Sequence, residues 1–133
     1  MRRLFALAVA VIFTPLMCVA EGKLSATEFD ALTRGKTFYY GKDGAPYGAE
    51  QYLEGREVVW SFLDGKCKRG QWYEEAGLIC FVYEDPADPQ CWSFESQTGG
   101  LIARFENDPA ATELYEVTQN PKPMLCLGPE VGV

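Results

Sequence analysis

Residues 57–83 read EVVWSFLDGKCKRGQWYEEAGLICFVY, and this stretch decides the fold. Three runs rich in Val, Trp, Tyr and Phe are separated by Asp64-Gly65 and by Glu75-Ala76-Gly77. Such runs, bounded by turn residues, are typical of antiparallel strands. Asp-Gly suits a two-residue type I′ turn, because both central positions of that turn need a positive φ. We therefore predict a meander of strands across this stretch.

The same pattern extends to both sides of these residues. Short aromatic or β-branched runs recur at intervals of roughly 8–14 residues, with Gly, Asp, Asn or Pro between them. The runs are Lys36–Tyr40, Tyr47–Leu53, Glu57–Leu63, Lys66–Tyr73, Leu78–Tyr83, Cys91–Glu95, Leu101–Glu106, Glu113–Thr118 and Met124–Leu127. Connections this short predict a mainly β domain of about eight antiparallel strands, closed as a small barrel or packed as a two-layer sandwich.

One short helix is predicted ahead of the strands. Ser25 and Glu28 have the spacing of a capping box, and Leu24 and Phe29 have the spacing of a hydrophobic staple. Gly35 is placed as a C-terminal cap. These signals predict a helix over residues 26–34.

The Asp64-Gly65 turn also predicts a register. A two-residue turn there places Trp60 opposite Arg69 and Val58 opposite Gln71. Carrying the meander through the next loop puts Cys80 opposite Gln71, and the run 78–83, apolar on both faces, is expected to be a central strand.

The candidate ligand-binding residues follow from this register: Trp60, Arg69 and Gln71. Arg69 could stack on Trp60, and polar groups in a barrel mouth fix the orientation of a small ligand. The alternative is that their face points outward, which would leave Arg69 an exposed cation. Aromatic residues at strand spacing form a core more often than a ligand site.

Residues 1–20 are predicted to be a signal peptide. Arg2 and Arg3 precede an apolar run from Leu4 to Val19, which is shorter than the roughly 20 residues of a membrane-spanning helix. Cys18 raises a lipoprotein alternative, but the bulky Met17 before it is a poor match to such signals. We expect one β-rich domain, residues 21–133, with a periplasmic or secreted location.

The charge of the chain excludes several partners. It holds 19 acidic and 12 basic side chains, and loss of Arg2 and Arg3 makes the balance still more acidic. Such a surface repels phosphate backbones and anionic lipids. We therefore expect no nucleic-acid partner and no membrane insertion after signal cleavage. The expected form is a monomer that binds an unknown protein or small ligand.

Four cysteines remain after the predicted cleavage: Cys67, Cys80, Cys91 and Cys126. An even number in a short exported chain is typical of a disulfide framework. Zinc is the competing interpretation, but the sequence has no histidine and no Cys-x-x-Cys pair.

Three segments carry a resemblance to a known group: Gly65–Trp72, Gly77–Tyr83 and Gln90-Cys91-Trp92. They resemble an uncharacterised family of small secreted proteobacterial β-rich proteins with a Gly-x-Trp, a cysteine-bearing strand and a second cysteine about ten residues later. The resemblance implies a small β fold outside the cytoplasm and the bridges Cys80–Cys91 and Cys67–Cys126, but no activity. A looser likeness, in size and β content, is to lipocalin-type protease inhibitors.

The sequence offers no recognisable catalytic, metal-binding or cofactor-binding residues. The lack of histidine removes the Ser-His-Asp and Cys-His arrangements. Paired carboxylates, as in Glu74-Glu75, are expected on the surface, and Asp85-Pro-Ala-Asp88-Pro lacks the ligand spacing of an EF-hand. The leading hypothesis is a non-enzymatic binding or inhibitor-like module. The alternatives are a small carboxylate-dependent hydrolase and a structural component of the cell envelope.

We predict that the secreted protein begins at Glu21, because small residues precede that position at the end of the apolar run. Intact-mass spectrometry of the exported form measures this directly. A diacylglycerol attached to Cys18 would contradict the prediction.

Overall fold

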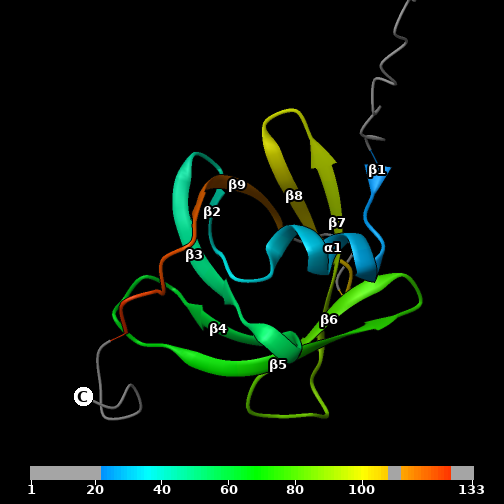
Figure 1. The fold of residues 1–133 in the computed structure, drawn as a ribbon, viewed down its shortest axis with the longest axis horizontal. Coiled ribbons are helices and arrows are strands. Elements are labelled where there is room, and N and C mark those ends of the chain that lie inside the picture. The colour runs from blue at the N-terminus through cyan, green and yellow to red at the C-terminus, as the bar shows by residue number, and fades with distance from the viewer. Residues whose placement is uncertain (1–21, 108–111, 127–133) are drawn as a thin grey trace, which may run out of the picture.

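The computed structural model describes residues 22–107 and 112–126, which form a β-barrel with one helix (Figure 1). In chain order the elements are β1 Gly22–Lys23, α1 Ala26–Thr33, β2 Thr37–Lys42, β3 Ala45–Tyr52, the 3₁₀ turn η1 Glu54–Arg56, β4 Glu57–Ser61, β5 Lys68–Glu75, β6 Leu78–Val82, β7 Gln90–Gln97, β8 Gly100–Phe105 and β9 Glu113–Asn120. The mainly β prediction is confirmed.

The strands close on themselves. Neighbours follow the order β1-β7-β6-β5-β4-β3-β2-β9-β8, and β8 pairs back onto β7. Strands β2–β9 therefore form an eight-stranded antiparallel barrel, with β1 paired to the distal part of β7. Of the two predicted architectures, the barrel is the one observed. Closure joins the outermost strands of the sheet, whose exposed edges could otherwise pair with other chains.

The helix α1 lies across one end of the barrel, where Figure 1 shows it in front of the ring of strands. Ser25 and Glu28 form the predicted capping box, and the helix ends one residue before the predicted boundary. Gly35 follows with φ 77°, and its N–H donates to the carbonyl oxygen of Tyr52 at 2.9 Å. This bond ties the end of α1 to the end of β3. Phe29 points into the barrel and is completely buried.

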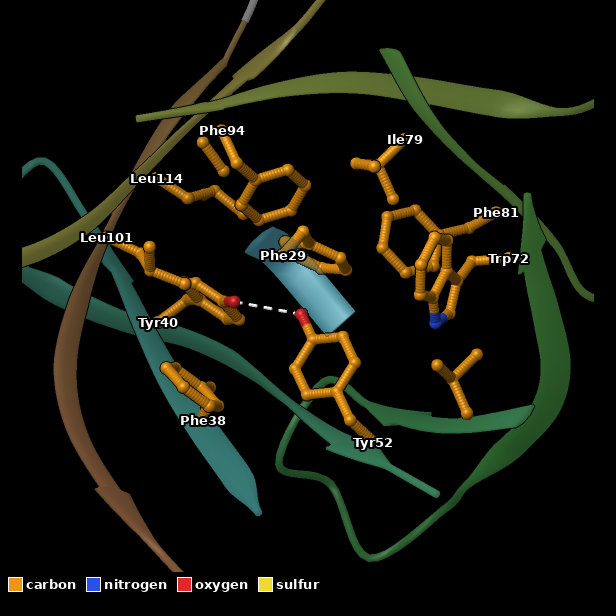
Figure 2. Packing of buried hydrophobic residues seen from close by; sticks show 12 residues of the cluster. Phe29, Phe38, Tyr40, Tyr52, Trp72, Ile79, Phe81, Phe94, Leu101 and Leu114 are labelled. Atoms are coloured by element: carbon orange, nitrogen blue, oxygen red, sulfur yellow. Dashed lines mark hydrogen bonds between the residues drawn. The ribbon is translucent and has the colours of Figure 1, made fainter. Parts of the chain in front are cut away.

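Inward-facing side chains pack around Phe29 inside the barrel (Figure 2). They alternate with outward-facing ones along each strand, as the pleat of a β-strand requires. The cluster consists of Phe29, Phe38, Tyr40, Tyr52, Val58, Trp72, Ile79, Phe81, Phe94, Leu101, Ala103 and Leu114. The helix thus supplies the central ring of a core whose remaining members come from strands.

Trp72 is buried in this cluster together with Ile79. Gly70 precedes it on the same face, and a Cβ there would lie 2.7 Å from the Tyr83 ring. The bare backbone of Gly70 thus makes room for the Tyr83 ring.

Two disulfides join Cys80 to Cys91 and Cys67 to Cys126, the pairing that the resemblance implies. Cys80 and Cys91 lie directly opposite each other on β6 and β7. The second bridge ties the segment after β9 to the outside of the barrel, where Met124 packs with Ala49 and Val59. The predicted terminal strand Met124–Leu127 is wrong for its described residues. This segment is a strap without strand pairing, and Leu127 lies outside the described residues.

The predicted register of β4 and β5 is wrong by one residue. The observed partners are Val59 with Arg69 and Trp60 with Lys68. The connection is not a two-residue turn, because β4 ends at Ser61 and Leu63 adopts φ 64°. The Ser61 hydroxyl accepts from the Leu63 N–H at 3.0 Å and stabilises this wider loop. Cys80 lies opposite Tyr73, so the predicted pairing of Cys80 with Gln71 is also wrong.

The predicted signal peptide, residues 1–20, lies outside the described residues. Among the residues that the structure does describe, no helix has the length and apolar character needed to span a membrane.

We expect Trp72→Ala to destabilise the oxidised protein by about 3–5 kcal/mol, as truncation of a buried aromatic side chain does. The Trp72 ring meets Phe29 edge-on at 5.2 Å between centroids, and Arg56 lies 4.5 Å from its centre. Glu75→Ala, on the exposed end of the same strand, is the control and should change stability by less than about 0.5 kcal/mol. Chemical denaturation measures both. Equal midpoints for Trp72→Ala and the parent would show that the indole does not contribute to the core.

Candidate functional site

The end of the barrel opposite α1 holds a cavity of about 230 Å³. Within residues 22–107 and 112–126 no helix covers the strand ends at this mouth, and exposed side chains of the rim border the cavity. Its walls are mainly aromatic: Tyr40, Tyr47, Tyr52, Trp60, Phe62, Phe81, Tyr83, Trp92 and Phe94. Apolar, concave sites with a few polar groups are typical of small-molecule binding.

Glu50 is the buried charged group of this cavity. It lies on β3 between Phe38 of β2 and Trp60 of β4, and only 2% of its surface is exposed. Its Oε1 accepts a hydrogen bond from the Tyr83 hydroxyl at 2.9 Å. Within residues 22–107 and 112–126, no hydrogen-bond donor reaches its Oε2. A buried polar atom without a partner is uncommon, and it marks a place where a ligand can bind.

Burial controls the protonation of Glu50. Desolvation raises the pKa of Glu50 well above its ordinary value of 4.5, and the hydrogen bond from Tyr83 lowers the pKa by a smaller amount. Burial and the nearby Glu50 carboxylate both raise the pKa of Tyr83. Glu50 therefore holds a proton at pH values where an exposed glutamate is ionised.

Two further phenols lie beside this carboxyl group. The hydroxyls of Tyr40 and Tyr52 share a hydrogen bond of 2.9 Å, the dashed line in Figure 2. Burial is the largest cause that raises the pKa of each. Both phenols stay neutral. The inner end of the cavity therefore presents polar, uncharged hydroxyl groups beside Glu50, whereas the other walls are mainly apolar.

The rim of the mouth is aromatic on one side and acidic on the other. The rings of Tyr47, Trp60 and Phe62 pack together in edge-to-face and tilted arrangements, with ring centroids 5.3–6.0 Å apart. Phe62 is 55% exposed, although it is a large apolar side chain. Lys68 and three carboxylates, Glu84, Asp85 and Asp88, complete the rim. The cavity is thus approached past more negative than positive charge.

The structure separates the three residues that the sequence grouped as ligand-binding candidates. Trp60 lines the cavity and shares the inner face with Trp72. Arg69 and Gln71 are exposed on the outer face of β5. The one-residue register difference is the cause, because it places Arg69 opposite the outward-facing Val59.

The remaining candidates, a rim aspartate and one set of possible metal ligands, offer less binding chemistry than Glu50. Asp85 is used in the rim loop itself, where its side chain accepts from the Ala87 N–H at 2.8 Å. In the described part of the chain, one set of possible metal ligands comes together: Glu75, Cys80 and Cys91. The two sulfur atoms are bonded to each other, so this set offers no thiolate.

Sequence reasoning missed Glu50 and Tyr83. The signal for Glu50 is its spacing of two from Tyr52, which places a carboxyl on the face of a large aromatic residue. The signal for Tyr83 is its spacing of two from Phe81 and four from Ile79. Neither spacing tells which face of the strand points into the barrel.

Comparison of the chain with protein-family models, with curated proteins and with solved structures gives no significant match. The interpretation of the site therefore depends on its geometry and chemistry.

We expect Glu50→Gln to change how stability depends on pH. The folded-state pKa of Glu50 lies above its unfolded-state value, so the unfolded chain releases this proton first as the pH rises. The stabilising contribution of Glu50 is complete below the ordinary value of 4.5 and is lost as the pH rises through its folded-state pKa. Glu50→Gln lacks this loss. As the pH rises through this window, its free energy of unfolding should therefore increase relative to that of the parent, by up to about 1.4 kcal/mol per pH unit.

Chemical denaturation of parent and variant across that window measures the difference. Parallel stability curves would contradict the raised pKa of Glu50.

Proposed function

We propose that this protein is a non-enzymatic binding module of the periplasm or the extracellular space, which takes a small ligand into the mouth of its barrel. The observation that carries the proposal is Glu50, which lines the cavity and whose buried Oε2 has no donor among the described residues. A ligand that supplies this donor would complete the hydrogen bonding of the site.

The size of the cavity favours a small molecule. Drug-sized sites have volumes of about 300–1,000 Å³, and this cavity lies below that range at about 230 Å³. The aromatic walls supply apolar contact area, while Glu50 and the neighbouring phenols supply orientation. This division of roles is typical of binding sites in barrels.

The proposed location is supported by the disulfides. The bridges Cys67–Cys126 and Cys80–Cys91 suit an oxidising compartment, which disulfides need in order to form and persist. The predicted signal peptide over residues 1–20 gives a route to that compartment.

A hydrolase that uses two carboxylates is the second candidate function, and Glu50 is also the observation that favours it. A carboxyl group whose pKa is raised in a concave site is suited to act as a general acid. Its partner would have to come from the rim, where Glu84, Asp85 and Asp88 are exposed. Binding is the better-supported function, since it needs only the cavity and its unpaired oxygen.

The binding proposal is tested by filling the cavity. Ala103 is buried on β8 and lines the cavity, so Ala103→Leu would place three additional carbon atoms in that space. Ala31→Leu, exposed on α1 at the other end of the barrel, is the matched control. A library of neutral, cationic and anionic fragments is screened by ligand-observed NMR against the parent. We expect the fragments that bind the parent to lose affinity for Ala103→Leu and to keep it for Ala31→Leu.

The same screen can contradict the proposal. A library without binders, or binders that are indifferent to Ala103→Leu, would show that the mouth is not a ligand site. Turnover of glycoside, ester or peptide substrates that Glu50→Gln abolishes in a folded protein would favour the hydrolase.

A further inference from the structure

Glu50 lines the cavity, and its two carboxyl oxygens differ: Oε1 accepts from the Tyr83 hydroxyl, whereas Oε2 is buried and has no donor among the described residues. An ionised carboxylate only accepts hydrogen bonds, so the group that completes it must be a donor. The strongest such donor is a positively charged N–H, because it also compensates the buried negative charge. The unpaired oxygen thus favours a cationic donor over a neutral one.

The walls of the cavity suit the same kind of group. Trp60 lies directly opposite Glu50 on the neighbouring strand, and Tyr47 and Phe62 extend the aromatic surface to the rim. Aromatic faces attract ammonium groups and also pack against apolar bodies. One molecule with a charged end and an apolar end would therefore use both parts of the cavity.

The rim adds attraction at longer range. Among the described residues the rim holds three carboxylates and one ammonium group, and Lys68 Nζ lies 3.9 Å from Glu84 Oε1. The whole chain has a net charge of −7. A cleft lined by one sign of charge concentrates ligands of the opposite sign.

We propose that the cavity selects small organic cations, namely primary amines with an apolar or aromatic body, whose ammonium group donates to Glu50 Oε2. This inference rests on the proposed function and adds the class of ligand. The ammonium lies at the inner end of the cavity, and the body of the ligand lies between Trp60 and the other aromatic walls.

A neutral ligand with a carbonyl group is the competing class, since a protonated Glu50 could donate to it. The two classes require opposite behaviour with pH. An amine needs the ionised carboxylate and binds more tightly as the pH rises, whereas a carbonyl needs the protonated form and binds more weakly.

Several titratable and charged groups near Glu50 influence how ligand binding depends on pH. Tyr83 bonds to it, and Tyr40 and Tyr52 lie within electrostatic range. From β9, Glu116 acts on Tyr40. The charged groups of the mouth are Lys68, Glu84, Asp85 and Asp88. The three phenols have raised pKa values and stay neutral, so Glu50 is the buried group that ionises.

The first experiment is isothermal titration calorimetry of the oxidised protein with 2-phenylethylamine and 2-phenylethanol. The two probes share a shape and differ in one group, ammonium against hydroxyl. At about pH 8 we expect the amine to bind about tenfold more tightly or better, as hydrogen bonds to charged groups do. Equal affinity for both probes would overturn the inference.

The matched variants are Glu50→Gln and Glu75→Gln. The first removes the charge from the cavity and keeps the size of the side chain. The second removes a charge from the exposed end of β5. We expect Glu50→Gln to lose the preference for the amine and to keep its affinity for the alcohol within about twofold, a change well below that for losing a charged hydrogen bond. Glu75→Gln should bind both probes as the parent does.

A measurement on the parent protein alone tests the inference even if Glu50→Gln does not fold. From about pH 5 to about pH 8.5 an alkylamine stays protonated, so changes in its affinity report on the protein. We expect affinity for the amine to rise with pH. Below the pKa of Glu50, binding should release a proton, seen as an enthalpy that depends on the buffer. Affinity that falls as the pH rises would overturn the inference in favour of a carbonyl ligand.

The outcomes separate this inference from the proposed function. Failure of the amine to bind, while neutral or anionic fragments bind and respond to Ala103→Leu, overturns the ligand class alone. Failure of every probe and fragment overturns both.

Discussion

The packing of Phe29 inside the barrel is the interaction on which the rest of the structure depends. Its ring is fully buried and lies 4.5 Å from the Phe94 centroid and 5.4 Å from that of Tyr52. A helix of eight residues is not stable alone in water, so α1 persists because this ring is buried and its first turn is capped. The same burial fills one end of the barrel. In the part of the chain that the structure describes, the other end has no comparable insert, and the cavity lies there.

The shape of that cavity depends on two glycines that let aromatic rings lie against the backbone. A Cβ at Gly48 would collide with the Trp60 ring, and one at Gly70 would collide with the Tyr83 ring. Tyr83 reaches Glu50 because its ring can occupy the space over Gly70. The wall of the cavity and the hydrogen bond from Tyr83 to its carboxyl group thus have the same local cause: a glycine that leaves space for an aromatic ring.

Local sequence signals predict the helix and the strands. The architecture and the strand register depend on pairing between strands that are distant in the sequence. The capping box and the aromatic runs placed α1 and the eight barrel strands to within a few residues. Local signals do not distinguish a barrel from a sandwich, because closure depends on the pairing of β2 with β9 and of β7 with β8, which no short segment encodes. The Asp64-Gly65 signal failed because Leu63 takes the positive φ that begins a wider loop. That loop shifted the register by one residue and moved Arg69 and Gln71 away from Trp60.

Glu50 determines the chemistry of the site because burial of its carboxyl group is energetically unfavourable. An apolar side chain between Phe38 and Trp60 would avoid the cost of desolvating a carboxyl group. Among the described residues the carboxyl group has one hydrogen-bond partner, Tyr83, and the phenols beside it are paired with each other. A donor from outside the chain would therefore improve the energy of the folded state. Binding to the folded state alone stabilises it by an amount that rises with ligand concentration. Stability, the ionisation of Glu50 and occupancy of the cavity are in this way coupled through one side chain.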